Sequence, residues 1–116
     1  MTAQNVIDSV RQLLRDTDAS NYRWTDAVVL VHLSDGEREF YQMRPDLFLN
    51  SSSTIDTPVD LTAVGDTMKL DEDNRNKLAS WVAALVLEED AAEETNLRRA
   101  ELMKQNVMRD LGVLNR

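Results

Sequence analysis

With 116 residues, of which 42% are hydrophobic, the chain is expected to fold as one domain with a buried core. It contains no cysteine, no apolar run long enough to span a membrane and no signal peptide, so a soluble protein without disulfides or thiolate metal sites is expected. Asp and Glu outnumber Lys and Arg by 21 to 13, and the net charge of −8 argues against a protein that binds nucleic acid by neutralising its phosphates.

The first expected helix covers residues 1–16 and carries a single apolar stripe. Its members recur at intervals of one, three and four residues: Val6, Ile7, Val10, Leu13 and Leu14. Residues 16–21 have turn chemistry, because their short polar side chains compete for local backbone groups. Trp24 is then expected to pack back onto the next helix or to enter the core.

The second expected helix, residues 25–44, has well-defined ends. Thr25 is a good N-cap, Asp26 suits the positive end of the helix dipole, and Pro45 prevents an interior continuation. An apolar stripe runs between these ends and is interrupted by Glu37: Val29, Leu30, Leu33, Phe40 and Tyr41. Gly36, in the middle of the helix, is expected to let another helix approach closely.

Val28 and Val31 lie off this main stripe, so the first half of the helix is apolar on a second side. A second apolar face on a small domain predicts a contact with a subunit or partner. The alternative is ordinary burial under the first helix.

Residues 50–70 are expected to form a loop with one or two short strand segments. They are rich in β-branched residues and are broken by Pro58 and Gly65. A connection of about 20 residues without a helix is unusual in a compact domain and is typical of functional or assembly loops.

Two further helices are expected, at 72–90 and 94–111, followed by a tail at 112–116. Asp71 is predicted to cap the third helix. Its apolar residues fall on one stripe, and small residues beside them are expected to allow close helix packing: Leu78, Trp81, Val82, Leu85 and Val86, with Ala79, Ala83 and Ala84. A helix break near 90–95 is expected, because the dipole disfavours carboxylates at a helix C-terminus. The fourth helix has its own apolar stripe, and Gly112 ends it: Leu97, Ala100, Met103, Val107, Met108 and Leu111. The prediction is a mainly α, four-helix small domain with a loop or short β-hairpin insertion between helices 2 and 3.

Candidate catalytic and metal sites are weak. His32 is the single histidine and is expected to be solvated. Residues 71–74 lack the glycine, the spacing and the final glutamate of a calcium loop. A carboxylate group at the end of the third helix is expected to be a solvated face: Glu88, Glu89, Asp90, Glu93 and Glu94. No enzyme activity, cofactor or metal is therefore predicted.

Three short stretches carry a family resemblance. Arg23-Trp24-Thr25-Asp26, the run Leu33-Ser34-Asp35-Gly36-Glu37-Arg38-Glu39, and Arg44-Pro45-Asp46 resemble the pattern of head-to-tail adaptor (connector, or head-completion) proteins of tailed bacteriophages. The resemblance covers most of the chain and is loosest at 50–70. Ser34 stands where Asn is common, and Val28 where Glu is common.

The resemblance implies a structural virion protein. Such adaptors are small helical proteins that form a ring, usually of twelve copies, beneath the portal in the neck of the virion. They extend the DNA channel, which DNA passes without specific binding, and they dock the tail. The expected partners are the portal protein, neighbouring adaptor subunits, and tail or nozzle proteins, with assembly in the host cytoplasm and no membrane partner.

The same resemblance assigns candidate contact residues. The C-terminal helix and tail are expected to reach the portal without being needed for the core: Val107, Met108, Leu111, Val113, Leu114 and Arg116. Neighbouring subunits are expected at Val28, Val31, Ile55 and Val59. The alternative is a small acidic helical regulatory protein that binds a host or phage protein, with mimicry of DNA charge as one mode of binding. A third reading, an enzyme using the carboxylate group, requires metal-dependent activity that depends on Glu93 or Glu94.

Overall fold

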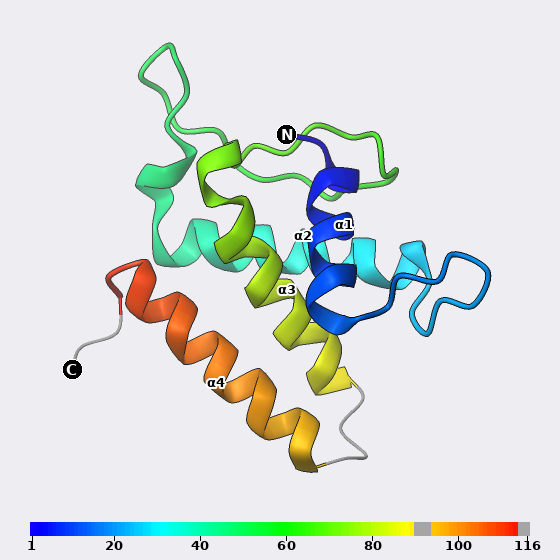
Figure 1. Ribbon diagram of the computed structural model, residues 1–116. Helices are drawn as coiled ribbons and strands as arrows, with labels where there is room; N and C mark the ends of the chain where they lie inside the picture. Colours follow the sequence, from blue (N-terminus) through cyan, green and yellow to red (C-terminus); the bar gives the residue numbers. More distant parts are fainter. Residues whose placement is uncertain (90–93, 114–116) are drawn as a thin grey trace.

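The computed structural model describes residues 1–89 and 94–113, and these form a mainly helical domain (Figure 1). The helices are α1 (Ala3–Leu14), α2 (Asp26–Met43), α3 (Arg75–Glu89) and α4 (Glu94–Asp110), with 3-10 turns η1 (Pro45–Phe48) and η2 (Glu72–Asn74). The domain is flattened, with principal extents of 42 × 37 × 19 Å. No helix in the described part of the chain is long and apolar enough to cross a membrane. The predicted mainly α class is confirmed.

Helix α3 is the centre of the packing. It contacts α1, α2 and α4, with α2 crossing behind it and α4 along its other side (Figure 1). Its three alanines are buried, which confirms the expected close approach of other helices. The expectation of a single stripe is wrong, because Leu87 is also buried while Leu85 is only partly covered. A helix packed on several sides needs apolar residues around most of its circumference.

Gly36 is the point of closest approach between α2 and α3. A Cβ atom placed there would lie 3.0 Å from Cγ2 of Val82 and 3.5 Å from Cδ1 of Leu78. Few real Cβ atoms come this close to a neighbour, so any larger residue at this position would require the Val82 side chain to shift. The prediction from the sequence is confirmed. Four residues later, Phe40 meets Trp81 edge-on, with ring centres 6.0 Å apart.

Three predicted helix ends are also confirmed. The hydroxyl of Thr25 accepts a hydrogen bond from the backbone N–H of Val28, at 3.3 Å. Helix α2 ends before Pro45, which opens η1. Gly112 has φ +76° and donates to the carbonyl of Arg109, while Val113 donates to that of Met108. This pair of bonds satisfies two terminal carbonyls of α4 and makes a Schellman ending.

Other boundaries differ from the prediction. Helix α1 stops at Leu14, because Arg15 adopts a left-handed conformation with φ +56°. Asp71 does not cap a backbone amide: its carboxylate accepts from the side-chain amide of Asn74 at 2.8 Å, and α3 begins after the η2 turn. Helix α3 ends at Glu89 and α4 starts at Glu94, so the break falls where it was expected, while residues 90–93 themselves lie outside the described residues.

The connection between η1 and η2 contains no strand in its described residues, which are complete over this range. It forms two isolated β-bridges instead, Leu49 with Ile55 and Thr2 with Thr67. The predicted strand segments were too short and too often broken to make a ladder, since strand pairing needs several consecutive residues on both sides. Residues near position 50 turn back sharply and project away from the body of the domain (Figure 1).

Candidate functional site

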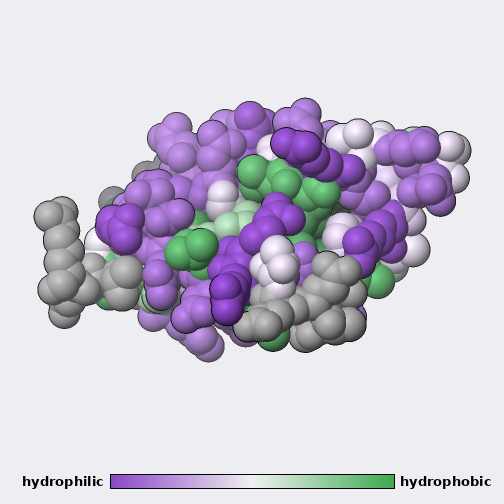
Figure 2. Space-filling view, turned by 60° about the horizontal axis from the view of Figure 1, so that its bottom comes forward, coloured by the Kyte–Doolittle hydropathy of each residue, from purple (hydrophilic) through white to green (hydrophobic). Residues whose placement is uncertain are grey.

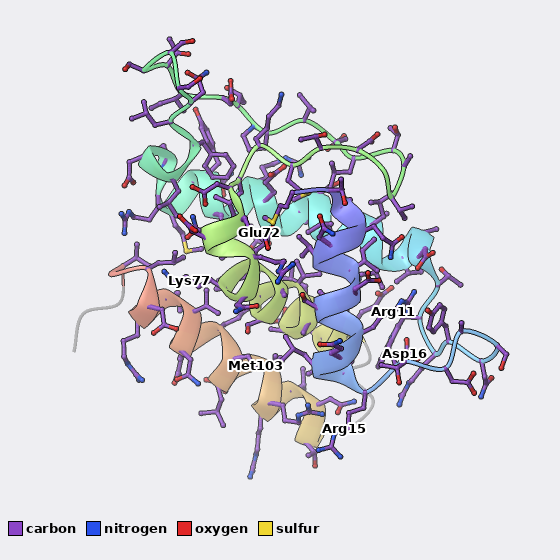
Figure 3. The ribbon with its side chains drawn as sticks, turned by 45° about the horizontal axis from the view of Figure 1, so that its top comes forward. Arg11, Arg15, Asp16, Glu72, Lys77 and Met103 are labelled. Carbon is purple, nitrogen blue, oxygen red and sulfur yellow. The ribbon has the colours of Figure 1, made fainter. Side chains whose placement is uncertain are left out.

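The first adaptor-like motif, residues 23–26, is organised around a buried arginine of α1. Arg11 is only 4% exposed, and its guanidinium donates to Asp16 at 2.8 Å, to the carbonyl of Trp24 at 2.9 Å and to Asp26 at 2.6 Å. The ring of Tyr22 covers it, 3.6 Å from Cζ of Arg11 to the ring centre. A buried charge is tolerated when it is paired and hydrogen-bonded in this way. Figure 3 shows Arg11 directed from α1 toward the segment that contains Asp16.

Asp16 completes this joint from the other side. Its carboxylate accepts from the backbone N–H of Arg23 at 2.8 Å and of Trp24 at 3.3 Å. Arg11 and Asp16 therefore bind each other, and each of them also holds residues 23–26 at the end of the loop between α1 and α2. This role of Arg11 was not predicted from the sequence. Its position, four residues after the buried Ile7, was the available signal, because that spacing places it on the apolar face of α1.

The second motif, residues 33–39, holds the connection that follows η1. Glu37 is 1% exposed, and one carboxylate oxygen accepts from the backbone N–H groups of Lys69 at 3.0 Å and Leu70 at 3.1 Å. Burial raises the pKa of Glu37 above its ordinary value, and these two hydrogen bonds partly oppose the shift. One helical turn earlier, the hydroxyl of Ser34 accepts from the N–H of Leu61 at 2.9 Å. Glu37, which interrupts the apolar stripe predicted for α2, therefore anchors the connection to this helix.

Further contacts hold the same part of the connection. Arg38 pairs with Asp60 and, at 3.1 Å, with Asp35. Asp66 accepts from the backbone N–H groups of Thr62 at 2.8 Å and Ala63 at 3.1 Å, and these bonds hold its pKa below the ordinary value. Residues 60–70 are thus tied to α2 and to their own turn.

The N-terminus of the chain is tied to the same residues. The N–H of Ala3 donates to the carbonyl of Asp66 at 2.9 Å, and that of Met68 donates to the carbonyl of Met1, also at 2.9 Å. The connection is therefore bound to side chains of α2 and, by main-chain hydrogen bonds, to the start of α1.

The third motif, residues 44–46, joins the ends of two helices. Arg44 forms a bidentate pair with Asp46, at 2.9 and 2.7 Å, and donates to the main-chain carbonyl of Leu111 at the end of α4. This pairing raises the pKa of Arg44 and lowers that of Asp46. Arg44 thus fixes the point from which the C-terminal tail leaves the domain.

His32 was predicted to be solvated, but its side chain is mostly covered and has a partner. Its side chain is 19% exposed, and Nε2 lies 2.5 Å from a carboxylate oxygen of Glu89. Glu88 pairs with Lys104 of α4 at 2.7 Å, and the Lys104 ammonium lies 5.1 Å from the ring centre of Trp81. These two carboxylates of the predicted solvated face therefore join helices. Asp90 and Glu93 lie outside the described residues, as does the side chain of Glu94.

Among the described residues, no group of three or more His, Cys, Asp or Glu is arranged to hold a metal ion. Hollows of about 200 and 230 Å³ flank α3, the first beside Lys77 and Met103 and the second beside Leu13 and Ser80. Figure 3 shows Lys77 and Met103 on neighbouring helices. The first hollow is lined by Lys77 and Asp110 together with amide, hydroxyl and apolar side chains, and the second by amide, hydroxyl and apolar side chains alone.

The four candidate subunit contacts differ in accessibility. Val31, Ile55 and Val59 are exposed, at 60%, 48% and 63%, whereas Val28 is partly buried. Ile55 stands beside Leu49, which is 58% exposed, at the base of the projecting turn. Exposed apolar groups therefore cluster on this connection, and Leu49 was missed as one of them.

The candidate portal contacts need a correction. Val107 and Leu111 are 3% and 2% exposed and belong to the core, so the expectation that this part of α4 is not needed for the core is wrong. They lie on the side of α4 that faces α3, and the helix would not pack without them. Met108 is partly covered and Val113 is 36% exposed. Leu114 and Arg116 lie outside the described residues.

The geometry is therefore one of three side-chain joints and two exposed regions, the projecting turn and α4. Comparison with protein-family models, with curated proteins and with solved structures finds no match to this chain.

Proposed function

We propose that this chain is a structural head-to-tail adaptor of a tailed bacteriophage, which forms a ring beneath the portal, extends the DNA channel and docks the tail. One observation carries the proposal: residues of all three resembling motifs make the joints of the fold. Arg11 and Asp16 fix residues 23–26, Glu37 holds the connection, and Arg44 holds the end of α4. When proteins share a sequence pattern because they share a fold, and not because they share a catalytic site, the residues of that pattern are expected to hold the fold together.

The proposed portal contact is the tail that follows Gly112. Arg44 fixes where this tail begins, and Val113 gives it an exposed apolar residue. The tail also contains Leu114 and Arg116, which provide an apolar and a basic group for a partner. Val31, Ile55 and Val59 are the proposed contacts with neighbouring subunits or tail proteins, because each is exposed without belonging to the core.

The charge of the chain fits a location in the virion neck. A net charge of −8 repels the phosphates of a passing duplex, so DNA would slide through the ring without binding it. A basic channel would retain DNA electrostatically.

Native mass spectrometry of the chain, alone and mixed with its portal ring, tests the proposal. We expect many copies, near the twelve that the resemblance implies, to load on one portal ring. Truncation after Val113 removes residues 114–116 of the tail but keeps both bonds that end α4, so it is expected to abolish loading without unfolding the domain. The variant Leu13→Ser, which changes an exposed residue of α1, is the matched control and is expected to load normally.

A chain that remains monomeric or dimeric and ignores the portal would overturn the adaptor proposal. That result would favour the small acidic regulatory protein, which acts in low copy number on a protein target. Normal loading of the chain truncated after Val113 would overturn the tail assignment alone.

A further inference from the structure

The projection, residues 49–59, places an asparagine at the start of an exposed turn. It leaves the domain at the end opposite the amino-terminal half of α4 (Figure 1), and Figure 2, which views the molecule from the side of α4, shows hydrophobic residues gathered there between charged ones. Asn50 is half-buried, whereas residues 51–54, three serines and a threonine, are all exposed. Water therefore reaches the turn that follows Asn50.

The side-chain amide of Asn50 is surrounded by hydrogen-bonding groups. Its Oδ1 accepts from the N–H groups of Ser52 at 2.9 Å and Thr54 at 3.2 Å, and the Thr54 hydroxyl lies 3.0 Å from the same atom. Its Nδ2 donates to Thr54 Oγ1 at 2.7 Å and to the Asp56 carboxylate at 3.0 Å. Donors around a carbonyl oxygen stabilise the negative charge that develops there when a nucleophile attacks the carbonyl carbon. These contacts favour attack at Cγ of Asn50.

The nucleophile in position for such an attack is the backbone nitrogen of Ser51. It closes a five-membered ring with Cγ of Asn50, and an attack within one chain gains from proximity. Ser51 is exposed, and its N–H has no hydrogen-bond partner among the residues that the structure describes. The side chain of Ser51 is small and hinders the approach little.

The other asparagines in the described part of the chain lack one or more of these features. Helical backbone angles hold the next nitrogen away from the side-chain carbon in those that lie inside helices: Asn5, Asn76, Asn96 and Asn106. Asn74 is buried in η2, where its side chain donates to Asp71. Asn21 is exposed, but the next residue is Tyr22, whose large ring packs on Arg11.

We propose that Asn50 is a site of spontaneous deamidation through a cyclic imide. The nitrogen of Ser51 bonds to Cγ of Asn50, the Cγ–Nδ2 bond breaks, and Nδ2 leaves as ammonia with the proton of the Ser51 N–H. A water molecule then opens the ring at one of its two carbonyl carbons. Opening at Cγ gives aspartate, and opening at the main-chain carbonyl carbon gives isoaspartate. The net reaction consumes water and releases ammonia.

The product changes the turn that Asn50 shapes. A carboxylate at this position cannot donate to Thr54, and it repels the Asp56 carboxylate that the amide now binds. Isoaspartate also adds one carbon to the main chain between Leu49 and Ile55, which are joined in a β-bridge. The projection therefore loses its arrangement as the chain ages. This inference concerns the isolated chain and does not depend on the proposed function.

Ageing of the purified chain in a mildly alkaline buffer tests the proposal. Peptide mapping by mass spectrometry follows the mass increase at each asparagine, and an isoaspartyl methyltransferase labels the isoaspartate fraction. We expect conversion at Asn50 to be at least about fivefold faster than at Asn21, the exposed asparagine with a large neighbour. Amide exchange at Ser52 and Thr54 should be faster in the converted chain, because their acceptor has changed.

Two variants of the turn identify the nucleophile. Ser51→Val keeps the attacking nitrogen but places a branched side chain beside it, so conversion at Asn50 should fall at least about fivefold. Ser52→Val is the matched control, because it keeps the N–H that binds Oδ1 and leaves Ser51 unchanged. Its conversion at Asn50 should stay within about twofold of that of the natural chain. Both positions are exposed, and thermal unfolding checks that both variants fold.

The proposal is overturned if Asn50 stays intact while the chain ages, or if Asn21 converts as fast as Asn50. It is also overturned if Ser51→Val converts at the natural rate, since the approach of the Ser51 nitrogen would then not limit the reaction. Equal slowing in Ser51→Val and Ser52→Val would overturn the assignment of the nucleophile. Formation of a ring on the portal is measured separately and is independent of these results.

Discussion

The two halves of the connection between η1 and η2 are held in different ways. Residues 60–70 are fixed from outside, by the Ser34 hydroxyl, the Glu37 carboxylate and the Arg38 guanidinium of α2. Residues 49–59 are fixed mainly from within, through Asn50, and leave their apolar side chains in solvent. The first half is part of the domain's architecture, whereas the second is prearranged but has few contacts with the body. Loops that bind partners are commonly built in this second way on a rigid base.

The largest effect is expected where the first half is anchored. Glu37→Leu removes the acceptor of the Lys69 and Leu70 N–H groups and leaves them without a partner in a largely buried place. We expect a loss of about 2 kcal/mol in the free energy of unfolding, since each unsatisfied group costs on the order of 1–3 kcal/mol and relief of the buried charge offsets part of it. Chemical denaturation at fixed protein concentration measures the loss.

Gln42→Leu is the matched control for this change. Gln42 lies on the same helix and is exposed, so its replacement is expected to shift stability by less than about 0.5 kcal/mol. Equal losses in the two variants would show that the Glu37 anchor does not hold the connection.

A smaller effect separates the charge of Glu37 from its hydrogen bonds. Because burial raises its pKa in the folded state, the folded chain binds this proton more tightly than the unfolded chain does. The stability that this proton provides is fully present below the ordinary pKa of 4.5 and is lost as the pH rises through the higher folded value. Glu37→Gln removes this dependence and keeps one acceptor oxygen. In denaturation experiments, the free energy of unfolding of the natural chain relative to that of Glu37→Gln should therefore be higher at pH 4 than at pH 7.

Asp66 provides the opposite sign. Hydrogen bonds from Thr62 and Ala63 lower its pKa, so its contribution is present above the ordinary value and is lost as the pH falls through the folded value. The free energy of unfolding of the natural chain relative to that of Asp66→Asn should therefore be higher at neutral pH than in acid. The same pH trend in both variants would contradict the assigned causes.

The sequence predicted the parts of this fold that depend on local chemistry. Thr25, Pro45 and Gly112 end helices through their own backbone or hydroxyl groups, and Gly36 is explained by its missing side chain. These effects act within a few residues or follow from one residue type, so a single sequence is enough to find them.

The joints could not be predicted in the same way. From the sequence, Glu37 was interpreted only as an interruption of an apolar stripe. Its structural role depends on backbone groups 32 and 33 residues away. Arg44 likewise acts on a carbonyl 67 residues away. Long-range hydrogen bonds to the main chain have no signature in the partner's residue type, because every residue except proline offers the same N–H. A buried charge on an apolar face is the one local sign of such a joint.

The smallest effect on stability is expected in residues 49–59, the projection. Asn50→Ala removes the side-chain bonds that shape residues 50–56, yet the free energy of unfolding should change by less than about 0.5 kcal/mol, because these residues lie outside the core. Amide exchange at Ser52 and Thr54 should become faster, and association between copies weaker, since the apolar residues are no longer prearranged. Ser53→Gly is the control: Ser53 has φ +60°, which glycine adopts readily, so exchange and association should be kept. A loss of stability as large as that of Glu37→Leu would mean that the projection unfolds with the core, and the contrast between the two halves of the connection would disappear.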